Sequence, residues 1–269
     1  GRSTVDHRPV RAGRNTDVNH RYFVHYVRQL PGWPSLKVLD FGCGEGEIVR
    51  LLRREGVDCR GAEVFYGGSA GGREAVADLL REGIVREIAE DGKLPFADDT
   101  FDLIISNQVL EHIKDLEGTL GEMDRVLKPG GRMYHHFPSR EVFREGHIGV
   151  PLVHRLPAGR FRQAYAACLR MIGFGKFHRD LPCDEWARRQ LAWLDAWCFY
   201  RPYRKLRAIL ERRFEVRHRE IEYCRFRAGD RSLLRFLLGL KPLEGLWQGI
   251  FRRLAFMAVE LRRRDTSSA

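Results

Sequence analysis

The chain has 269 residues, of which 43% are hydrophobic and 11% aromatic, which is enough for one large buried core and excludes a disordered protein. Residues 1–140 hold 20 basic and 22 acidic side chains, whereas residues 141–269 hold 27 and 14. The basic second part favours an anionic acceptor, a nucleic acid or an anionic membrane surface, although an arginine-rich solvated surface explains it equally well.

The six cysteines form no Cys-x-x-Cys pair and show no metal-ligand spacing. We therefore expect reduced thiols, no metal site and a cytoplasmic protein. The N-terminal residues contain no apolar signal core, and charged residues interrupt the apolar stretch 233–261, so no membrane-spanning helix is predicted. Peripheral contact with the inner face of a membrane through residues 233–264 is an alternative, as is packing of this segment on its own core or on a partner.

Strands and helices alternate in the first half of the chain. The expected elements are a helix at 22–30, a strand at 37–41, a helix at 47–55, a strand at 57–65, a helix at 73–81, strands at 84–88 and 101–106, a helix at 116–127 and a strand at 132–137. Because helices separate most of the strands, we expect an α/β fold with a mainly parallel sheet and right-handed crossovers.

This alternation stops after Pro138. Residues 139–182 are expected to be irregular, and residues 184–213 largely helical, with Pro202 beginning or breaking a segment. Residues 214–227 are expected to supply the last strand or strands. Residues 232–264 then read as an additional helical region that the sheet does not require.

A glycine-rich turn follows the first expected strand, in the sequence Asp40-Phe41-Gly42-Cys43-Gly44-Glu45-Gly46. Glycines at alternate positions let the backbone approach a ligand closely, and the next helix offers free N–H groups to an anion. The spacing differs from the dinucleotide-binding Gly-x-Gly-x-x-Gly. Glu63, seventeen residues past Gly46, ends the second strand, where an acid can reach the ribose hydroxyls of a nucleoside.

Four ordered blocks, at residues 38–46, 91–96, 101–112 and 122–131, together resemble the UbiE-like, type 11 methyltransferases. These belong to class I of the S-adenosylmethionine-dependent methyltransferases, and the resemblance covers about residues 36–138. It implies a Rossmann-like, doubly wound sheet of seven strands with helices on both faces, a helical cap inserted after the fifth strand and an extra C-terminal helical region. The glycine-rich connection 67–72 departs from the family pattern.

The resemblance also implies a division of the chain and a cofactor site. The parts are a flexible segment (1–18), an S-adenosylmethionine-binding core (19–138), an acceptor-binding cap (139–200), a completion of the sheet (201–230) and a C-terminal helical region (231–269). The implied cofactor residues lie at strand ends and are Asp40, Gly42, Gly44, Glu63, Asp91, Gly92, Asn107 and Gln108. The first three would line the methionine end, Glu63 would bind the ribose, the next two the adenine, and the last two would face the transferring methyl.

Three histidines are candidates for contact with the acceptor. His147 follows the fifth strand, where ligands bind at the carboxyl edge of a sheet, and is our candidate for a general base. A loop histidine that only holds the cap together is the alternative. His112 and His136 are candidate substrate contacts, although His112 also suits a structural role at a strand-to-helix turn, and at most one of the neighbours His135 and His136 can face the site.

The segment 139–200 is rich in aromatic residues and arginines, which suits a ring-bearing or anionic small molecule, although the aromatics also suit the core of a helical lid. Methyl transfer requires the donor methyl and the acceptor atom to be held about 3 Å apart and in line. We predict methylation of oxygen on a small molecule, a glycan or a lipid-linked intermediate. An RNA or protein methyltransferase is an alternative, and nucleic acid is not favoured because no RNA-binding signature is present. A non-catalytic cofactor-binding scaffold is a second alternative, and the sequence leaves the oligomeric state open.

Overall fold

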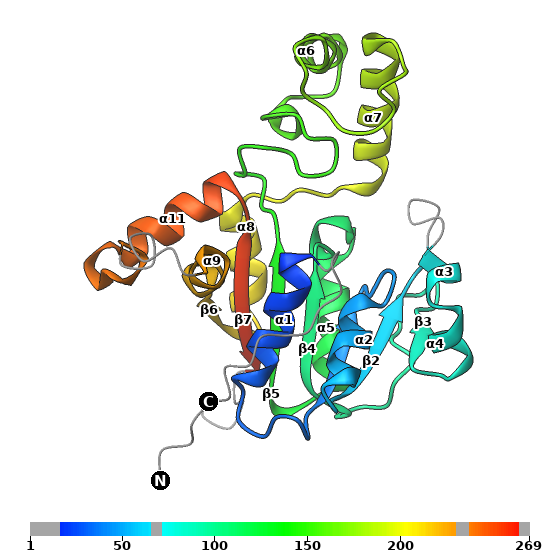
Figure 1. Cartoon of the computed structure of the whole chain (residues 1–269), viewed down its shortest axis with the longest axis vertical. Helices are drawn as coiled ribbons and strands as arrows, with labels where there is room; N and C mark the ends of the chain where they lie inside the picture. Colours follow the sequence, from blue (N-terminus) through cyan, green and yellow to red (C-terminus); the bar gives the residue numbers. More distant parts are fainter. Residues whose placement is uncertain (1–16, 66–71, 230–236, 264–269) are drawn as a thin grey trace.

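A computed structural model describes residues 17–65, 72–229 and 237–263 of the chain. At its centre is a seven-stranded sheet in the order β3-β2-β1-β4-β5-β7-β6 (Figure 1). The strands are β1 (Lys37–Phe41), β2 (Asp58–Glu63), β3 (Val85–Glu87), β4 (Phe101–Asn107), β5 (Leu127–Phe137), β6 (Phe214–His218) and β7 (Met257–Arg263). Strands β1 to β5 pair in parallel, whereas β7 runs antiparallel to β5 and β6. The predicted α/β fold with a mainly parallel seven-stranded sheet is confirmed.

Helices cover both faces of this sheet. The first core cluster packs α5 (Leu116–Val126) and α8 (Tyr203–Glu211) against Leu39, Ile104 and Met133. The second packs α1 (Val18–Arg28), α2 (Glu47–Arg54) and α9 (Glu220–Ala228) against Val38, Leu103 and Tyr134. Successive side chains of a strand point to opposite faces, so strands covered on both sides bury both sets of side chains.

The helix expected at 73–81 is two short helices, α3 (Gly72–Ala75) and α4 (Ala77–Arg81). Val76 separates them and is fully buried. A Cβ on Gly46 would lie 3.0 Å from a methyl of Val76 and 2.9 Å from one of Leu79, so the glycine turn gives this part of the chain room to pack. Residues 67–71 of the predicted glycine-rich connection lie outside the described residues, as do residues 1–16 of the predicted flexible segment.

The prediction for the end of the chain was wrong. Between residues 201 and 229, β6 is the one strand described, and α9 follows it. The other late strand, β7, comes from the segment 231–269, which we expected to be helical. Strand β7 lies between β5 and β6, so the sheet depends on it. Residues 257–261 are all buried, hence the strand lacks the alternation that marks a half-exposed strand. The helical part of this segment is α11 (Glu244–Leu254), none of whose residues is buried.

The cap, residues 139–200, stands beyond the sheet, where Figure 1 shows α6 and α7 above the labelled core helices. It contains α6 (Arg160–Met171) and α7 (Cys183–Trp197), so the expectation of an irregular segment 139–182 was wrong for α6. Gly159 precedes α6 and provides no side-chain cap, so no residue type marks the start of this helix in the sequence. The cap has its own core, formed by Ile148, Val150, Val153, Ala166, Trp186, Ala187, Leu191 and Leu194. No helix in the described ranges is long and apolar enough to cross a bilayer.

Candidate active site

A cavity of about 250 Å³ opens at the carboxyl ends of β1 and β4. Parallel neighbours in a sheet end at the same edge, which is how residues distant in the sequence meet here. Its lining includes four of the predicted cofactor residues: Asp40, Gly42, Gly44 and Asn107. Its other lining residues are His20, Cys43, Glu45, Glu47 and Ile48.

The glycine turn forms the floor of this cavity. Gly42 has φ +70°, and a Cβ there would lie 2.5 Å from a methyl of Val109, so only glycine fits. A Cβ on Gly44 would instead enter open space, which leaves the backbone exposed to a ligand. The Gly44 N–H donates to Glu63 Oε2 at 2.7 Å, so the carboxylate that ends β2 holds the turn in place. Glu63 is therefore adjacent to the cavity, and it is 8% exposed.

Asp40 is a buried carboxyl group at the end of β1. Burial, and then the charge of Glu63, raise the pKa of Asp40 to about 8. Its Oδ2 atom has no hydrogen-bond partner among the described residues. Because buried polar atoms are nearly always paired, this oxygen is suited to a donor or a cation supplied by a ligand.

The other predicted cofactor residues lie around this edge but do not line the cavity. Asp91 is exposed and accepts the Lys93 N–H at 2.9 Å, while Gly92 has φ +78° with open space beside it. Both follow β3, which pairs with the end of β2 at Glu63. Gln108 makes a sharp turn after β4 with φ +57°, and its N–H donates to the His136 carbonyl at 2.7 Å.

His136 lies inside the core and lines neither this cavity nor the cap pocket described below. Its ring contacts Tyr223 and Phe256 at centroid distances of 4.7 and 4.4 Å. Burial lowers the pKa of His136 to about 3, so the ring is neutral. Its Nδ1 atom lies 3.4 Å from Asn107 Oδ1, so His136 contacts the cavity only through Asn107.

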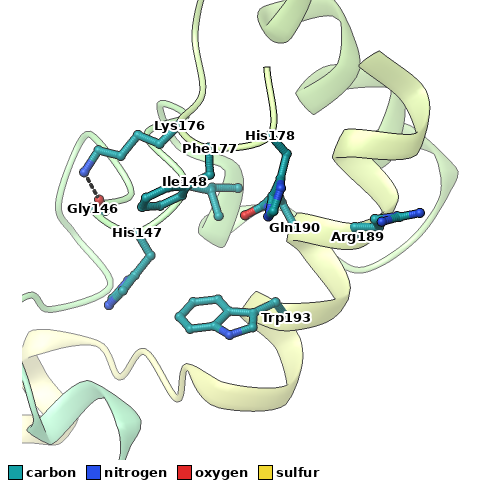
Figure 2. Close-up of a pocket in the computed structure, with 9 residues that line it drawn as sticks. All are labelled: Gly146, His147, Ile148, Lys176, Phe177, His178, Arg189, Gln190 and Trp193. Atoms are coloured by element: carbon teal, nitrogen blue, oxygen red, sulfur yellow. Dashed lines mark hydrogen bonds between the residues drawn. The ribbon is translucent and has the colours of Figure 1, made fainter. Parts of the chain in front are cut away.

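A larger pocket, of about 640 Å³, lies in the cap. Its lining residues are Gly146, His147, Ile148, Lys176, Phe177, His178, Arg189, Gln190 and Trp193 (Figure 2). Figure 2 shows His147 and Trp193 side by side along one border, with Ile148 and Phe177 across from them. Lys176 donates to the Gly146 carbonyl at 2.6 Å, and Arg189 points away from the pocket and pairs with Glu185.

His147 is fixed by a buried carboxylate. Its Nδ1 lies 2.7 Å from Glu145 Oε1, which also accepts the Tyr200 hydroxyl at 2.5 Å. Glu145 Oε2 accepts the Ile148 N–H at 2.6 Å. Burial alone would raise the pKa of Glu145, but the hydrogen bonds from His147 and Tyr200 lower it to about 2. The resulting carboxylate raises the pKa of His147 above its ordinary value, although burial opposes this.

His112 connects the sheet to the cap. It ends a single turn, η2 (Leu110–His112), directly after β4. Its Nδ1 lies 2.7 Å from the Trp197 carbonyl oxygen and its Nε2 lies 3.1 Å from Nε2 of His147. Burial lowers the pKa of His112. The structure thus brings together two of the three predicted histidines, which are 35 residues apart in the sequence.

Glu111 and Cys198 were not predicted as residues of this region, whereas Trp193 and Tyr200 were expected only as members of the aromatic set of residues 139–200. Glu111 is 2% exposed and burial raises its pKa to about 8. Tyr200 and Cys198 contact His147 across 53 and 51 residues of sequence. Contacts over such separations have no local spacing signal, so only the packing of the cap reveals them.

Comparisons with known proteins agree with this geometry. Residues 39–135, from β1 to β5, match a family model described as a methyltransferase domain. The chain is also similar to named methyltransferases. It is 32% identical over 162 residues to a ubiquinone biosynthesis O-methyltransferase of Azorhizobium caulinodans, covering 57% of this chain and 62% of the relative.

A second relative, the ubiquinone/menaquinone biosynthesis C-methyltransferase UbiE of Desulfotalea psychrophila, is 36% identical over 118 residues, or 43% of this chain and 46% of the relative. The chain thus spans less than two thirds of the length of either relative. An S-adenosylmethionine-dependent methyltransferase from Mesorhizobium loti shares the fold, with a TM-score of 0.51 at 18% identity over 92% of this chain and all of that one. The cofactor of the family is S-adenosylmethionine, and the unpaired Asp40 oxygen and the open space at Gly44 fit such a ligand.

Proposed function

We propose that this protein transfers a methyl group from S-adenosylmethionine to a small-molecule acceptor bound under the cap. The observation that carries the proposal is the contact between His112 and His147, whose Nε2 atoms lie 3.1 Å apart. It joins the strand edge that holds the cofactor cavity to the cap pocket. A donor at the edge and an acceptor in the pocket would then approach each other across this contact.

The residues at the sheet edge are proposed to hold the cofactor. Asp40, Gly42, Gly44 and Asn107 line the cavity and would bind the methionine end, with Gln108 beside them. Glu63, which positions Gly44, would accept from the ribose hydroxyls, and Asp91 with Gly92 would contact the adenine. Four acidic side chains in or beside this cavity, Asp40, Glu45, Glu47 and Glu63, suit a cationic sulfonium. The bound cofactor supplies the electrophilic methyl group.

The cap, residues 139–200, is proposed to bind the acceptor. Ile148, Phe177 and Trp193 give its pocket an apolar lining, while Lys176 adds positive charge at the border. This combination suits a ring-bearing or anionic acceptor. Oxygen is the proposed acceptor atom because a base is present, although the two relatives above are named as an O- and a C-methyltransferase.

His147 is proposed to take the proton of an acceptor hydroxyl. Glu145 and Tyr200 fix its Nδ1 side, so Nε2 is the atom that receives the proton. The acceptor oxygen then forms a bond to the methyl carbon while the carbon–sulfur bond breaks in line with it. Positioning supplies much of the rate, because the reacting atoms must lie about 3 Å apart and aligned.

A lipid-linked acceptor is supported by apolar side chains that are exposed beside the pocket. Met171, Ile172 and Phe177 are 69%, 71% and 64% exposed. Residues 146–179 contain six Lys and Arg residues and no Asp or Glu, which suits an anionic membrane surface. The contact predicted for residues 233–264 also stays a proposal, because Leu246 and Leu254 of α11 are 58% and 55% exposed.

The experiment is a product screen with purified protein and S-adenosylmethionine. Phenols, glycan precursors and lipid-linked intermediates are offered as acceptors, and mass spectrometry detects the gain of one CH2. The Asp40→Ala variant serves as the control. We expect product with at least one class together with formation of S-adenosylhomocysteine. Failure of the wild-type chain to bind either form of the cofactor in calorimetry would refute the proposal.

A further inference from the structure

Three side chains with metal-binding atoms meet at the wall of the cap pocket. They are His112 from η2, His147 from the loop after β5, and Cys198 directly after α7. One donor atom from each lies within 4.8 Å of the other two. Cys198 Sγ lies beside the same two rings, 3.8 Å from Nδ1 of His112 and 3.9 Å from Nδ1 of His147, and must turn toward the Nε2 atoms to join them in one ligand set. The three residues come from three separate segments, so the fold and not a local motif assembles them.

The hydrogen bonds decide where the ring protons lie. A carbonyl oxygen can only accept, so Nδ1 of His112 carries the proton that it shares with the Trp197 carbonyl at 2.7 Å. Glu145 already accepts two backbone N–H groups and the Tyr200 hydroxyl, so it also accepts from Nδ1 of His147. On the other side of the two rings, their Nε2 atoms face each other across 3.1 Å. Either a shared proton or a metal cation between these atoms removes the repulsion of their lone pairs.

Glu111 is an independent observation that favours a cation in this place. It precedes His112 and is 2% exposed. Neither of its carboxylate oxygens has a hydrogen-bond partner within the described parts of the chain. A buried carboxyl group without a partner is costly, and a nearby positive charge reduces that cost.

We propose that His112, His147 and Cys198 bind a divalent metal ion of the zinc type, with a fourth position open toward the cap pocket. Two imidazole nitrogens and one thiolate are the donor set that zinc prefers. Tetrahedral bonds of about 2.0–2.1 Å place two nitrogen ligands roughly 3.4 Å apart, close to the 3.1 Å between the two Nε2 atoms. The Trp197 carbonyl and the Glu145 carboxylate hold the opposite ring nitrogens, as outer partners of metal-bound histidines do.

The use of this metal in catalysis rests on the proposed function, whereas metal binding itself does not. An ion beside His147 borders the pocket that His147 lines, so an acceptor oxygen can occupy the open position. His147 is then a ligand and cannot take the acceptor proton; the metal would lower the pKa of the bound hydroxyl, which would release its proton to solvent. The sequence predicted no metal site because the three residues are 35 and 51 positions apart.

The test measures metal binding directly. The full chain is freed of metal with a chelator and titrated with Zn²⁺ in calorimetry, and Co²⁺ is used to detect the absorption of a cobalt–thiolate bond. Cys198→Ser and His112→Gln each remove one ligand and retain a polar side chain. Cys183→Ser is the matched control, since Cys183 is also half-buried and lies at the start of α7, outside the cluster.

We expect one equivalent of Zn²⁺ on the wild-type chain and the control, and an affinity at least about tenfold weaker in both ligand variants. Of the two cysteine variants, Cys198→Ser should lose the cobalt–thiolate absorption, whereas Cys183→Ser should retain it. A wild-type chain that binds no stoichiometric metal overturns the proposal, and the two Nε2 atoms then share a proton. Unchanged affinity in both ligand variants overturns it as well. Binding of S-adenosylhomocysteine to the same metal-free samples tests the cofactor site separately, and it also shows that the variants are folded.

Discussion

The sheet edge and the cap build their sites in opposite ways. At the edge, the cavity residues come from strand ends and from one turn, and backbone geometry at Gly42 and Gly44 shapes the site. In the cap, side chains from three segments meet around His147, and hydrogen bonds between them fix its ring. The edge therefore depends on local sequence, whereas the cap depends on long-range packing.

The two regions also differ in charge. Acidic side chains gather at the cofactor cavity, whereas residues 146–179 contain cations without any acid. This difference suits a cationic donor in one region and an anionic acceptor in the other. Because the cap has its own apolar core, we expect the two sites to respond separately to mutation. The following predictions test that separation.

Trp186→Ala should have the largest effect. Trp186 is fully buried in the cap core, and its Nε1 donates to the Lys176 carbonyl at 3.0 Å. Removing a buried tryptophan costs about 3–5 kcal/mol, which should unfold the cap locally. Hydrogen exchange should increase in α6 and α7, while calorimetric affinity for S-adenosylhomocysteine stays unchanged. Trp186→Phe is the milder control, and a parallel loss of cofactor affinity would show that the regions are not separable.

His147→Ala should lower turnover by about 100-fold or more, because it removes the group proposed to take the acceptor proton. Steady-state kinetics with the acceptor from the product screen measure the effect. Cofactor affinity should not change, since His147 does not line the cofactor cavity. Full activity in this variant would remove His147 as the base.

Glu63→Ala should weaken cofactor binding by about 10- to 100-fold, because it removes a charged hydrogen-bond acceptor and leaves the Gly44 N–H unpaired. Glu63→Gln keeps an acceptor for Gly44 and should lose less. Calorimetry with S-adenosylhomocysteine measures both variants. The assignment of the cofactor site fails if Glu63→Ala and Asp40→Ala both bind as tightly as the wild-type chain.

The smallest expected effect is a pH dependence at Asp40. Its pKa of about 8 means that the carboxyl is neutral at lower pH, whereas a cationic sulfonium prefers the ionised form. Affinity for S-adenosylmethionine should thus rise with pH up to about 8, by at most roughly tenfold per unit. Asp40→Asn should remove this slope, and a slope that persists in the variant would contradict the prediction.

The same group affects stability with a definite sign. Between the ordinary pKa of an aspartate and 8, folded Asp40 holds a proton that the unfolded chain has lost. Its contribution to the free energy of unfolding should accordingly decrease as pH rises through this window. Thermal unfolding of the wild-type chain and Asp40→Asn at two pH values in this window measures the difference.

The first five strands, and the grouping of the candidate cofactor residues at one edge of the sheet, could be predicted from local sequence patterns. Strands β1 and β4 each contain a short run of buried apolar residues, and Gly42 in the turn after β1 has a local steric reason. Because parallel strands end at one edge, the order of strands and turns already placed Asp40, Glu63 and Asn107 near one another. Signals of this kind act over a few residues and can be read without knowing the fold.

The last strand and the cluster in the cap could not be predicted from the sequence, because both depend on tertiary contacts. Strand β7 is buried on both faces, and Arg219 from another element neutralises its Glu260. The strand therefore lacks the alternation of apolar and polar residues that marks a half-exposed strand. The cluster of His112, His147 and Cys198 requires the cap to fold back over the end of β4. Contacts of this kind depend on chain segments tens of residues apart, and their energy arises only when the whole core has packed.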